Sequence, residues 1–280
     1  MSHGYDLTLA ERKRLKDKKI TKHYLANMLT HWFNAFSWFF LFPTGLGILA
    51  AKRMPFVPGQ WNNLMRNIFG GLAPLIQAHE IWGQIWLFVL TFNVLFGFRK
   101  YFVPFAATRM VMDKDDWVWL AKKLPSMMGA NVELPPQDAY NGGQKLYSYV
   151  VVLGTIAIGF TGLIMTYSEI VPDALRWVVQ WAMPIHFLAV STVFAGVIIH
   201  VYMGAIMPEE RQAFFSMFSG KVSALYAYLH HRKWYDQKMA EEHEAEAEYV
   251  ARHLLESHSG AELDDLLDAL DGSTARAAGD

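Results

Sequence analysis

Four apolar runs, each longer than 20 residues, constrain the fold of this 280-residue chain more than any other feature. They cover approximately residues 28–51, 74–98, 146–167 and 181–206. A helix of about 20 apolar residues crosses the ~30 Å hydrocarbon core of a bilayer, so each run is long enough to span a membrane. The hydrophobic fraction of 53% is also too high for an ordinary soluble domain. The sequence therefore predicts an all-α protein, an integral membrane four-helix bundle.

Basic residues outside the runs predict the orientation of the bundle. Seven Lys and Arg precede the first run, seven separate the second from the third, and seven follow the fourth. Three lie between the first and second runs and one between the third and fourth. Because Lys and Arg concentrate on the cytoplasmic side, we expect both termini and the 99–145 connection to be cytoplasmic. The basic start lacks a signal-peptide pattern, so we expect a multi-pass protein of the bacterial inner membrane.

The distribution of charge divides the chain into four predicted parts. Residues 1–27 are a basic cytoplasmic segment, and residues 28–206 form the four-helix domain. Residues 207–236 are expected to contact a partner or the membrane surface. Residues 237–280 are an acidic tail, helical or partly disordered, since the residues after Ala240 include 12 acidic and 2 basic side chains.

Four histidines fall inside the predicted spans. His31 lies near the cytoplasmic start of the first span and His79 near the outer start of the second. His186 and His200 lie at the outer and cytoplasmic ends of the fourth. On a helix, their separation of 14 residues corresponds to about 21 Å along the axis and only ~40° in azimuth. The topology therefore pairs His31 with His200 near the inside and His79 with His186 near the outside.

Paired imidazoles within a membrane favour haem over other cofactors. Iron accepts two imidazole ligands, and a haem needs an apolar slot between helices, so we expect two haems with these four histidines as iron ligands. Zinc usually requires three or four close ligands, and a proton relay would use more acids than Glu80, the one acid expected in a span. The alternative of another class is a haem-free membrane anchor or transporter. The chain has no cysteine, so an iron–sulfur cluster would have to lie in another subunit.

Glycines within the runs have two interpretations. They would let a flat macrocycle approach the backbone, or they would let neighbouring helices pack closely. The glycines concerned are Gly45, Gly47, Gly83, Gly154, Gly159, Gly162 and Gly196.

Two polar stretches are expected near the cytoplasmic side, and one of them has both a structural and a binding interpretation. Residues 113–123 are expected to form a short surface helix, and Asn141-Gly142-Gly143-Gln144 precedes the third run. Asn and Gln there are typical of a turn and a helix cap, or they would supply hydrogen-bond donors to a quinone carbonyl beside the inner haem. The adjacent His230 and His231 would point to different faces of a helix, so we expect an interfacial or partner-contact role for them.

Several motifs occur in a specific order between about residues 25 and 236. They are Thr30-His31-Trp32, Pro43-Thr44-Gly45, His79 followed by Gly83, Tyr140-Asn141-Gly142-Gly143-Gln144-Lys145, Thr161-Gly162, His186, Ile199-His200-Val201-Tyr202-Met203, Gly220-Lys221-Val222-Ser223 and His230-His231-Arg232-Lys233-Trp234-Tyr235. Together they resemble the cytochrome b (gamma) subunit of membrane-bound respiratory formate dehydrogenases.

The resemblance implies specific roles and partners. His31 and His200 would bind the inner haem b, and His79 and His186 the outer one. Asn141, Gly143, Gln144 and His200 would border a menaquinone site.

An iron–sulfur subunit and a molybdenum or tungsten catalytic subunit would lie outside the membrane, so formate oxidation would need no catalytic residue of this chain. Electrons would pass from the iron–sulfur subunit to menaquinone, with proton uptake from the cytoplasm. Similar cytochromes serve hydrogenases or sulfur-compound reductases, and some would oxidise quinol, so these stay as alternatives. Membrane lipid and quinone are expected partners, and nucleic acid is not.

Overall fold

The computed structural model describes residues 7–51, 57–99 and 103–257. In chain order its elements are α1 (Leu9–Asp17), β1 (Lys19–Thr21), α2 (Leu25–Ala51), α3 (Gly59–Phe69), α4 (Leu72–Gly97), α5 (Val103–Phe105), α6 (Lys114–Met127), α7 (Gly142–Thr166), α8 (Arg176–Val201), α9 (Arg211–Ser219), β2 (Lys221–Ser223), α10 (Ala224–His230) and α11 (Arg232–Ser257). Wide π-helical turns extend α5 (Ala106–Met110) and α8 (Tyr202–Ile206), and 3-10 turns cover Ser168–Ile170, Asp173–Leu175 and Pro208–Glu210. The predicted tail beyond Ser257 lies outside the described residues.

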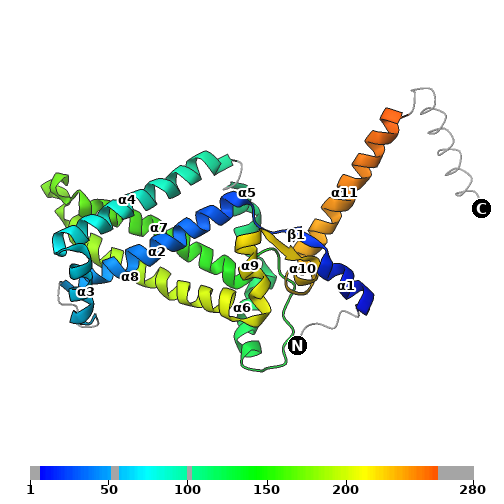
Figure 1. Cartoon of the computed structure of the whole chain (residues 1–280), viewed down its shortest axis with the longest axis horizontal. Coiled ribbons are helices and arrows are strands. Elements are labelled where there is room, and N and C mark those ends of the chain that lie inside the picture. The colour runs from blue at the N-terminus through cyan, green and yellow to red at the C-terminus, as the bar shows by residue number, and fades with distance from the viewer. Residues whose placement is uncertain (1–6, 52–56, 100–102, 258–280) are drawn as a thin grey trace, which may run out of the picture.

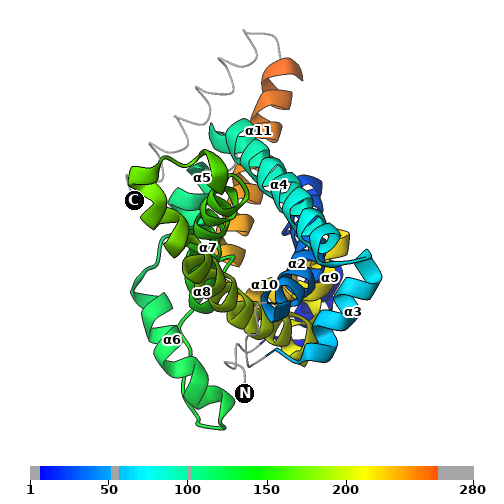
Figure 2. The ribbon, with the colours of Figure 1, turned by 90° about the vertical axis from the view of Figure 1, so that its left-hand side faces the viewer.

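Among the described residues, four helices have the length and apolar composition to cross a membrane, as predicted. The segments are Leu25–Leu49, Leu72–Gly97, Gly142–Thr166 and Asp173–Ile206. α2 packs against α4, and α7 packs against α8, while α4 and α7 join the two pairs. Figure 2, which looks along the bundle, shows α2 and α4 on one side and α7 and α8 on the other. The all-α membrane bundle is therefore confirmed.

Helix α3 covers one end of α2, which we call the α3 end of the bundle (Figure 1). Asn62 donates its side-chain amide to the Gly47 carbonyl at 2.8 Å, and Trp61 donates its indole N–H to the Pro43 carbonyl at 3.1 Å. A Cβ on Gly47 would come within 2.7 Å of the Met65 side chain. This glycine therefore allows α3 to lie directly on α2.

The opposite end carries a small folded unit built from both ends of the chain. β1 pairs with β2 in antiparallel register, with Ile20 opposite Val222. Both side chains lie in a core with Leu15 of α1, Tyr226 of α10 and Trp234 of α11. We call α1, β1, β2, α10 and the first turns of α11 the terminal unit. The outer part of α11 projects from it (Figure 1) and is exposed from Glu241 to His253.

The predicted contact role is wrong for His231, which lies inside the terminal unit with 2% of its surface exposed. Burial lowers the pKa of this imidazole, so the ring is neutral. Its Nδ1 lies 2.6 Å from the Asp138 carbonyl and its Nε2 lies 3.2 Å from Lys22 Nζ. A neutral ring satisfies both neighbours, with Nδ1–H donating and Nε2 accepting. Burial also lowers the pKa of Lys22 to about 8.

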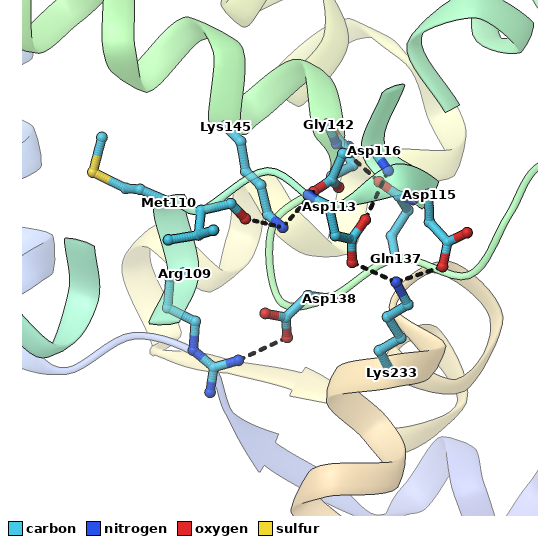
Figure 3. Close-up of polar contacts among 12 residues, drawn as sticks. Arg109, Met110, Asp113, Asp115, Asp116, Gln137, Asp138, Gly142, Lys145 and Lys233 are labelled. Atoms are coloured by element: carbon cyan, nitrogen blue, oxygen red, sulfur yellow. Dashed lines mark hydrogen bonds and ion pairs between the residues drawn. The ribbon is translucent and has the colours of Figure 1, made fainter. Parts of the chain in front are cut away.

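A buried ion pair joins α6 to the start of α7 (Figure 3). Lys145 Nζ lies 2.7 Å from Asp116 Oδ2, and the two side chains are 4% and 2% exposed. Lys145 also donates to the Val111 carbonyl at 3.1 Å. A Cβ on Gly142 would lie only 2.6 Å from the Asp116 carbonyl oxygen, so glycine permits the close approach of the two helices. The predicted surface helix around residues 113–123 is thus present as α6 and is fixed to a span.

Asp116→Ala should destabilise the bundle strongly, because it leaves the Lys145 ammonium buried without its counter-ion. Removing one partner of a buried pair typically costs ~3–5 kcal/mol. Denaturant unfolding of the detergent-solubilised protein would measure the loss. Glu248→Ala is the control, since it breaks the exposed Glu248–Arg252 pair on α11 and should leave stability unchanged. Equal midpoints for the two variants would contradict this role of the buried pair.

Candidate functional site

At the α3 end, two of the predicted histidines are held by threonines on the preceding long helices. His79 of α4 places Nδ1 2.9 Å from Thr44 Oγ1 of α2. His186 of α8 places Nδ1 2.9 Å from Thr161 Oγ1 of α7. Thr44 and Thr161 are 3% and 6% exposed, so water does not compete for these hydrogen bonds.

The hydrogen bonds of each threonine determine which nitrogen of its histidine carries the proton. The Thr44 hydroxyl donates to the Phe40 carbonyl at 2.9 Å, and the Thr161 hydroxyl donates to the Ala157 carbonyl at 2.6 Å. A hydroxyl has one proton, so each oxygen then accepts from the imidazole Nδ1–H. The Nε2 atoms of His79 and His186 keep their lone pairs. Fixing a ring in this way is what metal-binding histidines require of their neighbours.

The residue after each threonine is a glycine that makes room for the histidine. A Cβ on Gly45 would lie 3.2 Å from His79 Cε1, and one on Gly162 would lie 3.7 Å from His186 Cε1. Most of the other span glycines serve helix packing instead. A Cβ on Gly47, Gly154, Gly159 or Gly196 would lie within 3 Å of Met65, Val193, Leu87 or Tyr147, whereas Gly83 has only Leu41 nearby at 3.9 Å.

At the terminal-unit end, His31 of α2 and His200 of α8 face each other. Their ring centroids are 6.2 Å apart. An imidazole nitrogen binds a metal such as zinc at about 2 Å, and that nitrogen lies ~1.1 Å from the centre of its ring. Two imidazoles on opposite sides of one metal would therefore have ring centres about 6.2 Å apart. The pair therefore has the spacing of two axial imidazoles on one metal. His31 Nδ1 is buried and has no hydrogen-bond partner within the described part of the chain.

Aromatic side chains surround the second pair. Tyr147 of α7 stacks on His200 with ring centroids 5.6 Å apart. It reaches this position because Gly196 of α8 has no side chain, since a Cβ there would lie 2.2 Å from the tyrosine ring. Trp32, next to His31, donates its indole N–H to the Met217 carbonyl of α9 at 2.8 Å. These contacts fix the helices on either side of the pair.

The donor set fits haem iron and does not fit a bare metal ion. Within residues 7–51, 57–99 and 103–257, no three His, Cys, Asp or Glu side chains gather as a metal site. A haem supplies four nitrogens to its iron, so it needs only one or two protein ligands. The structure brings His31 and His200 together at the terminal-unit end, and it places His79 and His186 at the α3 end, each against its own threonine.

The predicted quinone residues form the N-terminal cap of α7. The Asn141 side chain accepts from the Gln144 backbone N–H at 2.9 Å, and the Gln144 side chain accepts from the Asn141 backbone N–H at 3.0 Å. This reciprocal capping box is the structural alternative considered for the stretch. Gly143 lies against Trp119 of α6. Tyr147, one turn after Gln144, contacts His200, so the stretch lies within one turn of a residue beside this histidine pair.

The sequence analysis gave no role to three side chains of the site: Thr44 and Thr161, which it named only within motifs, and Tyr147. A repeated Thr-Gly dipeptide, at residues 44–45 and 161–162, was the available signal. The spacing of residues in a span does not show which threonines contact a histidine. Thr192, for example, donates its hydroxyl to the Leu188 carbonyl of its own helix.

Comparisons with known proteins find similar chains among cytochrome b subunits of formate dehydrogenases. The chain is 24% identical over 233 residues to the "Formate dehydrogenase, nitrate-inducible, cytochrome b556(Fdn) subunit" of Escherichia coli (strain K12), covering 83% of this chain and 98% of the relative. It is 23% identical over 216 residues to the "Formate dehydrogenase, cytochrome b556(fdo) subunit" of the same organism, covering 77% and 92%. It is 21% identical over 223 residues to the "Formate dehydrogenase, cytochrome b556 subunit" of Haemophilus influenzae, covering 80% and 85%.

A family model agrees with these relatives over most of the chain. The model described as "Prokaryotic cytochrome b561" matches residues 22–220, which include all four spans and all four paired histidines. The family model and these relatives confirm the resemblance, noted from the motifs, to the cytochrome b subunits of formate dehydrogenases. Cytochromes b are haem b proteins, in agreement with the donor set. The chain is a membrane cytochrome b and belongs to the prokaryotic cytochrome b561 family.

Proposed function

We propose that the chain is the membrane cytochrome b subunit of a formate dehydrogenase complex and binds two haems b. The observation that carries the proposal is the placement of four histidines at the two ends of one bundle. His31 and His200 have ring centroids 6.2 Å apart, and His79 and His186 are each hydrogen-bonded to a buried threonine. An iron–sulfur subunit and a molybdenum or tungsten catalytic subunit would complete the complex. The names of the relatives support formate as the electron donor.

Each pair of residues has a distinct task in this proposal. His79 and His186, held by Thr44 and Thr161, would hold the haem at the α3 end. His31 and His200 would hold the haem at the terminal-unit end. When bound, the two haems supply one-electron transfer between a donor at one end and a quinone at the other. The 14 residues from His186 to His200 separate the two levels by about 21 Å.

The basic residues support a cytoplasmic terminal unit in the bacterial inner membrane. With that orientation, the α3 end faces outward, where the iron–sulfur partner would dock. Menaquinone would be reduced at the cytoplasmic end, with proton uptake from the cytoplasm. Asn141, Gly143 and Gln144 are proposed to border it, because Gln144 lies one turn before Tyr147, which contacts His200. The amide N–H groups of Asn141 and Gln144 are the donors available to a quinone oxygen.

Haem content tests the ligand assignment. The wild-type chain should contain two haems b, and His79→Ala or His200→Ala should each reduce this to one, because each removes an axial ligand. A pyridine haemochrome assay against protein concentration gives the ratio. His243→Ala, an exposed histidine on α11, should retain both haems. A wild-type chain without haem, produced with haem and its partners present, would instead indicate an anchor or transporter.

We expect Thr44 and Thr161 to affect the affinity and the midpoint potential of the haem at the α3 end. Thr44→Val removes the acceptor that fixes His79, and such neighbours typically contribute about 10–100-fold to metal affinity. We expect faster loss of that haem and a shift in its midpoint potential in a redox titration. Thr44→Ser should restore both properties. Thr192→Val is the matched control, because the Thr192 hydroxyl bonds only the Leu188 carbonyl; a similar effect there would contradict the role of Thr44.

The quinone and capping roles of Gln144 can be separated with one substitution. Glu serves as well as Gln at this position of a capping box, so Gln144→Glu should preserve the helix start while removing the amide N–H donors. We expect the complex to lose reduction of a menaquinone analogue but to keep electron transfer to a dye that accepts from the iron–sulfur partner. Unchanged quinone reduction would leave Gln144 with its structural role alone. Gln144→Ala, which removes both functions, should also lower stability.

A further inference from the structure

Helix α6 runs across the bundle axis, whereas the four spans run along it (Figures 1 and 2). A reciprocal capping box between Asp113 and Asp116 starts the helix, and the buried Asp116–Lys145 pair ties it to α7. Trp119 lies against Gly143. These contacts hold α6 at the level where the α7 span begins.

The surface of α6 has three different sides. One side, with Asp116 and Trp119, is buried against the protein. A second side carries the exposed apolar residues Trp117 and Leu124, and Met128, the residue at the C-cap, follows them; the three are 58%, 64% and 80% exposed. They lie at positions i, i+7 and i+11, so they form one stripe. We call these three residues the α6 stripe.

The third side of α6 is polar. It includes Asp115, which pairs with Lys233 at 2.6 Å, and Lys122, which donates to the Glu133 carbonyl at 3.2 Å. The α6 stripe lies between the side that contacts protein and the polar side. Its apolar side chains would be stabilised by contact with an apolar medium. Such a three-sided pattern is typical of helices that lie in the plane of a membrane interface.

Helix α9 has a related character at the same level of the bundle in Figure 1. Its Phe215 and Phe218 are 52% and 59% exposed, and Phe218 packs on Trp32 near the start of α2. The side of α7 that faces lipid begins close to α6, with Leu146 and Leu153 at 43% and 68% exposure. The start of α6 therefore lies beside the beginning of a span whose other side chains are exposed and apolar.

We propose that α6 is an interfacial helix whose stripe is covered by the phospholipid of the membrane surface at the terminal-unit end. Trp117 lies at the depth that tryptophan prefers, and the polar side faces water. Because α6 is tied to Lys145 and Gly143, the lipid contact sets the depth of the N-terminus of α7. This inference depends on the membrane spans and not on the proposed electron donor or quinone.

The absence of cysteine from the natural sequence allows single spin labels to test the proposal. The variants Trp117→Cys, Leu124→Cys and Met128→Cys would each be labelled in the full chain, loaded with haem and reconstituted in liposomes of phosphatidylethanolamine and phosphatidylglycerol. Collision with oxygen, which concentrates in lipid, and with a water-soluble nickel chelate reports the surroundings of each label. Leu153→Cys gives the lipid reference and Glu244→Cys on α11 the water reference. Lys122→Cys is the matched control on α6 itself.

All three stripe labels should collide more with oxygen than with nickel, as the Leu153 label does, while the Lys122 and Glu244 labels show the reverse. Labels at 117 and 124 should report the same depth, because a helix along the membrane normal would separate them by about 10 Å. Nickel accessibility at the stripe would overturn the proposal, and so would a depth difference of that size. Labels that neither reagent reaches would show that protein, such as a second copy, covers the stripe.

Discussion

A polar side chain within the hydrocarbon must find its hydrogen-bond partner inside the protein, because lipid offers none. The bundle meets this constraint across its helix pairs, as in the bond of 2.7 Å from the Trp86 indole to Asn34. At the α3 end the same constraint acquires a chemical consequence. Thr44 and Thr161 satisfy His79 and His186, and in doing so they leave one nitrogen of each ring free. Stability and ligand orientation thus depend on the same two hydrogen bonds.

The same Thr–His hydrogen bond occurs in both helix pairs of the bundle, α2 with α4 and α7 with α8. In each half the first long helix supplies a Thr-Gly dipeptide and the next supplies the histidine. The threonine and histidine are 35 residues apart in the first half and 25 in the second. The extra residues include α3, which lies over the end of α2. The first half therefore carries an additional cover at the end of the bundle where we propose that a partner subunit docks.

Span positions and the meeting of His31 with His200 could be predicted because hydrophobic length and alternating topology are strong constraints on a short membrane chain. The spans were placed within a few residues of α2, α4, α7 and α8. The burial of His231 could not be predicted, because spacing shows that adjacent residues face apart but not which face is buried. The Asp116–Lys145 pair could not be predicted either, because its residues are 29 positions apart and lie in a connection with many other charged side chains. Three-residue strands such as β1 and β2 have no periodicity to detect.

The pairing of β1 with β2 also fixes an order of events during synthesis. Ile20 and Val222 are neighbours in the sheet, yet nearly the whole bundle lies between them in the chain. Residues so distant in sequence meet late, because the intervening chain must first be made and arranged. β1 leaves the ribosome before any span and has no strand to pair with until all four have been made. The terminal-unit end therefore cannot close until all four spans have been made.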